Sequence, residues 1–112
     1  YPQGNYIRPA DSKPYLVIGE VKYGKPILDR VITPKVSIGD ASRCALISMD
    51  STLKSDLTVG PPIDFAVIKK DEIKIASLKC LNMNDPEFSK VCNQWSQGIF
   101  KIFDSFQRFD WE

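Results

Sequence analysis

The sequence contains no histidine, and this absence removes several kinds of chemistry at once. Without an imidazole, Ser-His and Cys-His dyads cannot form, and no metal can be bound through histidine. The chain also lacks the glycine-rich loops that bind phosphates through backbone amides. Its acidic residues are scattered, and no pair has the spacing that glycoside hydrolysis requires. We therefore expect no cofactor and no metal site.

Net charge and long apolar runs are also scarce. The formal charge is +1, so the composition favours neither nucleic acid nor an anionic membrane as a partner. No apolar run approaches the roughly 20 residues of a transmembrane helix, and no signal-peptide pattern is present. The cysteines are odd in number, lack CxxC spacing and lie in apolar stretches: Cys44, Cys80 and Cys92. This pattern is typical of reduced, buried thiols in a cytoplasmic protein.

The length of 112 residues indicates one domain, 1–112. Prolines and glycines are frequent in residues 1–14 and predict an irregular arm, so the folded part would be 15–112. Residues 15–18 are apolar strand formers and predict the first strand. A short helix would then begin at Pro26 and end before Thr33-Pro34.

Most of the structural information is concentrated in residues 40–68, which predict a long helix, a turn and an apolar strand. Apolar residues recur at steps of three and four, which indicates a helix that begins at Ser37 or Asp40. This helix would end by about Asp56, because Gly60-Pro61-Pro62 cannot continue it. Residues 63–68 form an almost unbroken apolar run, which predicts a strand covered on both faces.

A hairpin is predicted next. The polar residues 69–72 separate residues 63–68 from a second apolar run that starts at Ile73, which favours a four-residue loop between two strands. Residues 73–81 alternate imperfectly, so either both faces are partly covered or a bulge changes the register.

The last element predicted is a long helix. Asn84-Asp85-Pro86 supplies an N-cap and a proline at the first turn. The apolar and aromatic stripe that follows keeps helical spacing for about five turns, which is typical of a core or a subunit interface. We expect Trp95 and Phe103 to be buried, and Gly98 to mark a close packing contact. The order is then strand-helix-helix-strand-strand-helix, an α+β fold with helices layered on a small sheet.

Two polar groups at the ends of elements are candidate site residues. Glu20 and Lys22 follow the first predicted strand, and Asp56 and Thr58 follow the long helix. Loops at such ends often carry function. An ordinary solvated or capping role accounts for the same residues.

Several stretches resemble the second half of the Anbu family, the bacterial proteasome-type proteases. They are residues 18–30, 45–52 and 55–64, and the endings Asn84-Asp85-Pro86, Trp95 and Phe109-Asp110-Trp111 are similar to the C-terminus of that family. The similarity covers nearly the whole chain from Pro14 onward. It identifies the chain as the C-terminal half of such a protein, starting abruptly at Tyr1.

The resemblance implies an N-terminal nucleophile hydrolase fold, an αββα sandwich of two sheets between helical layers. It also implies a threonine-type peptidase that acts on peptides or proteins and assembles into rings or spirals. The nucleophile would belong to the other half of the protein. Asp56 matches the acid that helps to position the amine of the nucleophile. Thr58 stands one position before the hydroxyl residue of the family, and Glu20 stands in place of its serine.

Two classes of function remain open. The chain is either the accessory half of an amide-hydrolysing enzyme or an assembly module without chemistry. With tyrosine at position 1 and no histidine, we expect the chain alone to be inactive. The exposed aromatic residues expected from half of a sandwich predict a homo-oligomer.

Overall fold

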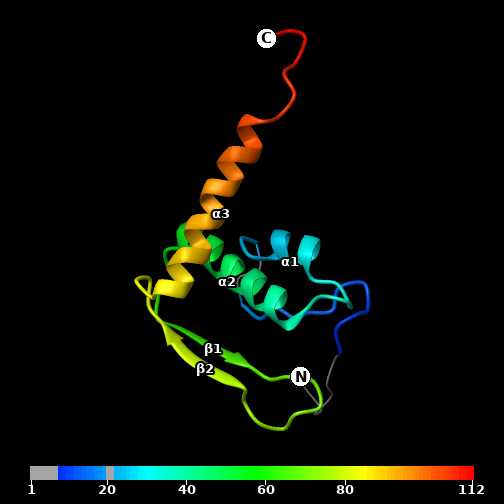
Figure 1. The fold of residues 1–112 in the computed structure, drawn as a ribbon, viewed down its shortest axis with the longest axis vertical. Coiled ribbons are helices and arrows are strands. Elements are labelled where there is room, and N and C mark those ends of the chain that lie inside the picture. Colours follow the sequence, from blue (N-terminus) through cyan, green and yellow to red (C-terminus); the bar gives the residue numbers. More distant parts are fainter. Residues whose placement is uncertain (1–7, 20–21) are drawn as a thin grey trace.

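The computed structural model describes residues 8–19 and 22–112. Three helices and a two-stranded antiparallel sheet follow one another in the order α1, α2, β1, β2, α3 (Figure 1). The helices are α1 (Lys25–Val31), α2 (Ile38–Ser55) and α3 (Pro86–Asp104), and the strands are β1 (Ile63–Val67) and β2 (Ser77–Leu81). The predicted α+β class is confirmed.

Both long helices begin at side-chain caps that the sequence indicates. The Ser37 hydroxyl oxygen accepts a hydrogen bond from the Asp40 amide at 3.0 Å, and the Asp85 carboxylate accepts one from the Phe88 amide at 3.0 Å. These bonds satisfy donors that the first turn of a helix leaves without a partner. The helix α2 ends at Asp56, as predicted.

The prediction of a strand at residues 15–18 is wrong. These residues follow an irregular path, and Leu16 is 55% and Ile18 98% exposed. A strand requires a neighbour for its backbone groups. In the described chain, the backbone pairing near this segment is an isolated bridge between Ala10 and Lys13. Residues 14–18 instead border a hollow of about 440 Å³ beside α1 and α2.

The hairpin is confirmed, but its loop is longer than the predicted four residues. Ile63 lies opposite Leu81 and Val67 opposite Ser77. The connection therefore spans residues 68–76, and Ile73, predicted to start the second strand, is fully exposed. The chain turns at Asp71, whose left-handed backbone (φ 64°) suits Asp better than most residues.

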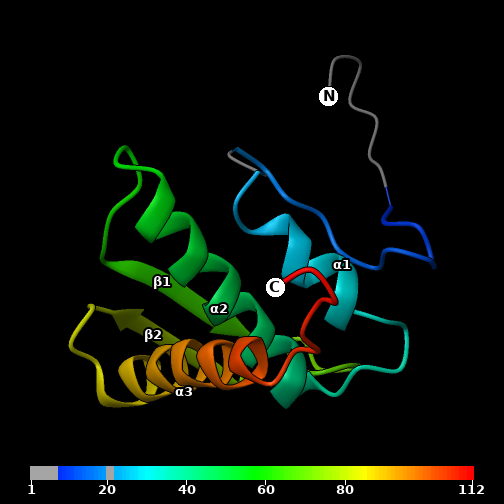
Figure 2. The same cartoon turned by 90° about the horizontal axis from the view of Figure 1, so that it is seen from above.

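The expected coverage of β1 on both faces is also wrong. Ile63 is buried and Phe65 and Val67 are half-buried, whereas Asp64 and Ala66 are exposed. This alternation is that of a strand with one face on the core. The two-stranded sheet has helices packed on one side of it within the described chain (Figure 2).

The core lies where α2, α3 and the hairpin meet. Its buried members are Ile63, Leu81, Phe88 and Cys92, and half-buried residues of α2 and β1 pack against them. Phe88 is 1% exposed and is the largest fully buried side chain of the described residues. Only the first half of α3 reaches this core, because the second half extends away from the other elements (Figure 1).

Three expectations about α3 are therefore wrong. Trp95 is 37% and Phe103 67% exposed, so neither is buried. A Cβ placed on Gly98 would have no atom of the described chain within 4 Å, so this glycine marks no close contact. The apolar stripe continues past the point where α2 and the hairpin end.

The expectation of three buried thiols holds for two of them. Cys44 and Cys92 are buried, and Cys80 is exposed. Cys80 lies opposite the exposed Asp64, on the uncovered face of the hairpin. None of the helices in the described ranges is both long enough and apolar enough to cross a membrane.

Candidate functional site

The turn after α2 holds a carboxylate in a fixed position. Asp56 is the C-cap of α2, and its amide donates to the Thr52 carbonyl at 2.8 Å. Its Oδ1 accepts two hydrogen bonds from Thr58, from the hydroxyl at 2.6 Å and from the amide at 2.9 Å. These bonds, the hydroxyl bond first, lower the pKa of the Asp56 carboxyl from its usual 3.8. Asp56 is therefore ionised at neutral pH.

An ionised carboxylate of this kind is suited to holding a positive group. Because its pKa is lowered, Asp56 is a weak base and is poorly matched to removing a proton from a hydroxyl at neutral pH. It is well matched to accepting a hydrogen bond from an amine or an ammonium. Asp56 and Thr58, both proposed from the sequence, are thus brought together by the structure.

The other candidate loop is described only in part. Glu20 lies outside the described residues, so its prediction stands without a structural description. Gly19 before it has a left-handed backbone, with φ 91°, and Lys22 after it is exposed. The chain then passes through Gly24 into α1.

A polar contact between this loop and α2 was not found from the sequence. The Ser48 hydroxyl donates to the Gly24 carbonyl at 3.0 Å, and the Thr52 hydroxyl donates to the Ser48 carbonyl at 3.0 Å. Ser48 and Thr52 are 8% and 6% exposed. The sequence held one signal for this contact. Ser48 and Thr52 are hydroxyl residues four positions apart, and they share the face of α2 that carries its apolar residues.

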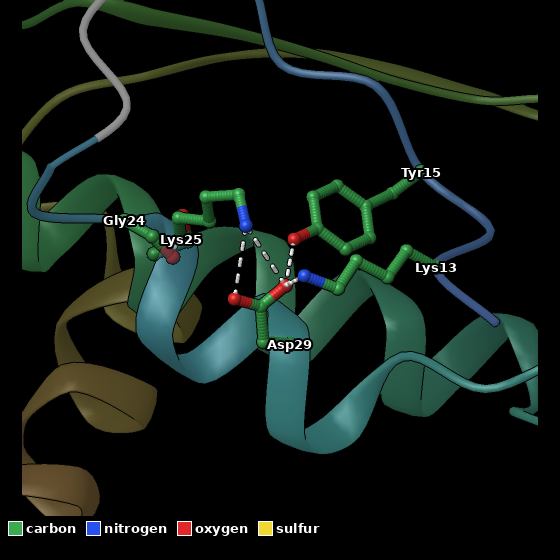
Figure 3. A network of polar contacts seen from close by, with 6 residues as sticks. Lys13, Tyr15, Gly24, Lys25 and Asp29 are labelled. Atoms are coloured by element: carbon green, nitrogen blue, oxygen red, sulfur yellow. Dashed lines mark hydrogen bonds and ion pairs between the residues drawn. The ribbon is translucent and has the colours of Figure 1, made fainter. Parts of the chain in front are cut away.

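A second polar cluster ties the arm before residue 19 to α1 (Figure 3). Asp29 accepts a hydrogen bond from the Tyr15 hydroxyl and forms an ion pair with Lys25 at 3.1 Å, with Lys13 3.7 Å away. The bond from Tyr15, followed by that from Lys25, lowers the pKa of Asp29, and the same Tyr15 bond raises the pKa of the phenol. These exposed groups hold the arm in place and leave no activated nucleophile.

Asp50 is a buried charge in α2. It is 2% exposed, and its Oδ2 forms an ion pair with Lys54 at 3.1 Å. Its Oδ1 has no hydrogen-bond partner among the residues that the structure describes. Burial, and then the Asp50 charge, raise the pKa of the Cys92 thiol to about 11.

The buried thiols are therefore not nucleophiles. Burial also raises the pKa of Cys44. Because the thiolate is the reactive form, both side chains are unreactive at neutral pH. In residues 8–19 and 22–112, no group of three or more His, Cys, Asp or Glu side chains is arranged to bind a metal.

Comparison with known proteins gives matches among solved structures, whereas no family model and no curated protein matches. Anbu from Hyphomicrobium sp. strain MC1 has 41% identity and a TM-score of 0.89, over 98% of this chain and 47% of that one. Anbu (ancestral beta-subunit) from Yersinia bercovieri has 40% identity and a TM-score of 0.91, over 98% and 47%. The helical assembly of the Anbu complex from Pseudomonas aeruginosa has 40% identity and a TM-score of 0.87, over 97% and 45%.

These matches define the class of protein. The chain has part of the fold of a bacterial proteasome-like protein and spans about half the length of the structures that it matches. Within this class it belongs to the Anbu family. The resemblance identified from residues 18–30, 45–52 and 55–64 is confirmed.

Proposed function

We propose that this chain is the supporting part of a proteasome-type threonine peptidase, an N-terminal nucleophile hydrolase whose nucleophile lies on another segment of the subunit. The observation that carries the proposal is the ionised Asp56 carboxylate, fixed by Thr58 at the end of α2. The match to Anbu covers about 47% of the Anbu chain, and this supports a catalytic unit larger than the present chain.

Asp56 has a defined task in this proposal. In such hydrolases the α-amine of the first residue acts as the base for its own side chain. Asp56 accepts a hydrogen bond from that amine, orients it and stabilises the ammonium that forms when it takes up a proton. Thr58 orients the carboxylate and lowers its pKa, and Glu20, which lies outside the described residues, stays a candidate from the sequence alone.

The activity is tested with short fluorogenic peptides. The 112-residue chain is assayed alone and after fusion to the complementary half of a related Anbu subunit. The chain alone should be inactive, because the thiols of Cys44 and Cys92 are protonated and buried and no nucleophile with a base in reach is available among the described residues. The fused protein should cleave amide bonds.

The role of Asp56 is tested in the same fused protein. Asp56→Asn should lower kcat by about tenfold to a hundredfold, because the amide replaces the charge that stabilises the ammonium. Asp71→Asn, which changes an exposed carboxylate in the loop of the hairpin, is the matched control and should have no effect. Turnover by the chain alone would disprove the external nucleophile, and an unaffected Asp56→Asn enzyme would disprove the assignment of Asp56.

A non-catalytic assembly module is the second candidate function. It is favoured by large exposed aromatic side chains at the end of the chain: Phe100, Phe103, Phe106, Phe109 and Trp111. Such patches mark interaction surfaces, and the Pseudomonas aeruginosa match is a helical assembly. We propose a homo-oligomer, with a peptide or protein substrate bound through the complete subunit. A fused protein that assembles but does not hydrolyse peptides would favour this second function.

A cytoplasmic location is part of the proposal. All three cysteines are free thiols, two of them buried in the core region. Reduced cysteines are the rule in the cytoplasm.

A further inference from the structure

We propose that the groove between α1, α2 and α3 binds the C-terminal tail, residues 105–112, of a second copy of this chain. The inference deepens the homo-oligomer of the proposed function and rests on it, because it names the two surfaces that meet. The tail binds through the ring of Trp111 and the carboxylate of Asp110.

The groove consists of two hollows that share a wall. Their volumes are about 310 and 380 Å³, and Ser51, Trp95 and Ile99 line both of them. The larger hollow extends along α1, and the smaller one extends along the second half of α2, where Lys54 lines it. Binding pockets in proteins typically measure about 300 to 1,000 Å³. Trp95, which is 37% exposed, is therefore a wall of this groove and not a core residue.

The larger hollow combines apolar walls with a cation. On the α1 side it is lined by Arg30 and by apolar or aromatic side chains: Tyr23, Pro26, Ile27 and Val31. The helix α1 has no buried residue, so these side chains lack a complete cover within the described chain. Arg30 forms no ion pair with any residue that the structure describes, and none of the described residues lining this hollow is acidic. The hollow is thus suited to an aromatic ring that has a carboxylate beside it.

The tail carries these two groups. The rings of Phe109 and Trp111 are stacked, with centroids 5.2 Å apart and 8° between their planes, and they are 63% and 79% exposed. Asp110 lies between them in the sequence, is exposed and has no ion pair within the described residues. The tail therefore presents an aromatic pair and a carboxylate to solvent. Burial of the rings in an apolar groove is favourable, and the charges of Asp110 and Arg30 are complementary.

The tail does not reach the groove of its own chain. The hydrogen bonds that residues 105–112 form with described residues all lie within residues 102–112. The helix α3 carries the tail away from α1 and α2 (Figure 1). A second copy related by a twofold axis brings each tail to the groove of the other chain. Two such contacts form a closed pair, which is the usual arrangement of a homodimer.

The first test locates the binding site of the tail. The protein is the full chain with Trp111→Ala, in which the groove is free and Trp95 is the only tryptophan. An unlabelled peptide of residues 105–112 is added to this isotope-labelled variant. The indole N–H signal of Trp95 and the amide signal of Ser51 should shift and saturate with a Kd of roughly tens of micromolar, as for a weak interface. The amide signal of Ile73 in the hairpin loop should stay in place.

An indole signal of Trp95 that does not move at about 1 mM peptide, where even a weak complex is populated, would overturn the proposal. The same titration with a peptide carrying Trp111→Ala measures the contribution of the ring. This peptide should bind at least about tenfold more weakly, since buried tryptophans dominate such contacts. Equal binding of both peptides would also overturn the proposal.

A double-mutant cycle tests the charge pair. Arg30→Ala in the protein should weaken binding of the peptide by about threefold to fivefold, the size expected for a partly exposed ion pair. Asp110→Asn in the peptide should have the same effect, and the two changes together should cause no further loss. Lys90→Ala removes an exposed cation of α3 outside both hollows and is the matched control. Losses that add, or Arg30→Ala without effect, would overturn the pairing of Arg30 with Asp110.

Dilution shows whether the tail comes from a second copy. In the wild-type chain the Trp95 indole signal should move toward its position in Trp111→Ala as the protein is diluted from about 500 to about 10 μM, a range that spans the expected Kd. A signal that differs from that of the variant at every concentration would place the tail in the groove of its own chain. A signal equal to that of the variant throughout would leave the groove without the tail. Either result would overturn the proposal.

Sedimentation of the wild-type and Trp111→Ala chains keeps this inference separate from the proposed homo-oligomer. Trp111→Ala should weaken association by about tenfold. Equal association of both chains would leave the homo-oligomer intact and overturn the tail as its contact. Peptide binding at the groove of a chain that stays monomeric would disprove the homo-oligomer and support the recognition of the tail by the groove.

Discussion

The two halves of α3 share one apolar pattern but differ in what covers them. In the first half Phe88 is 1% exposed and Cys92 is buried against α2 and the hairpin. In the second half Phe100 and Phe103 are 72% and 67% exposed, since the helix extends past the other elements (Figure 1). A helical stripe identifies the apolar face of a helix. It does not identify the surface that will cover that face.

The largest expected effect is at the buried end of α3. Phe88→Ala should lower the free energy of unfolding by about 3–5 kcal/mol, because it removes a fully buried ring from the centre of the core. Urea unfolding followed by circular dichroism measures this. A loss below about 1 kcal/mol would show that the first half of α3 is not core.

The thiols provide a second contrast between buried and exposed parts. Cys92, with a pKa of about 11, should react with iodoacetamide at pH 7.5 at least about a hundredfold more slowly than the exposed Cys80. Peptide mass spectrometry of timed samples gives both rates in one experiment. Cys80→Ser is the control, and equal rates for the two thiols would contradict the burial of Cys92.

The smallest effect on stability is expected in the second half of α3. Phe103→Ala should change the free energy of unfolding of the monomeric chain by no more than about 0.5 kcal/mol, since most of the ring is already in water. Dilute samples, in which association is negligible, are needed for this unfolding measurement. A loss as large as that of Phe88→Ala would mean that the ring is covered within one chain.

Local features of the fold were predictable from the sequence. The caps Ser37 and Asp85 and the proline-ended helix α1 depend on residues a few positions apart, and the structure confirms them. The predicted strand at residues 15–18 and the burial of Trp95 depend on distant partners. These predictions failed because no strand of the described chain pairs with residues 15–18, and the neighbouring elements cover Trp95 only in part.

The candidate site divides in the same way. Asp56 and Thr58 were identified from their place after the long helix and then from the resemblance to Anbu, and their hydrogen bonds are local, spanning two residues. The contact of Gly24 with Ser48 joins residues 24 positions apart. The hydroxyl of Ser48 on the apolar face of α2 is visible in the sequence, but nothing in the sequence indicates Gly24 as its partner, because the approach of the loop to α2 is a tertiary feature.

The central claim is that the second half of α3 is an interface, and the mass of the chain in solution tests it most directly. Sedimentation velocity at tens of micromolar, roughly the range in which a weak interface is still populated, should show a dimer or larger species. Phe103→Ala should weaken the association by about tenfold, as expected for a central aromatic contact, whereas Ile73→Ala, at an exposed position on the hairpin loop, should not. A wild-type chain that sediments only as a monomer, or association that is unaffected by Phe103→Ala, would contradict the claim.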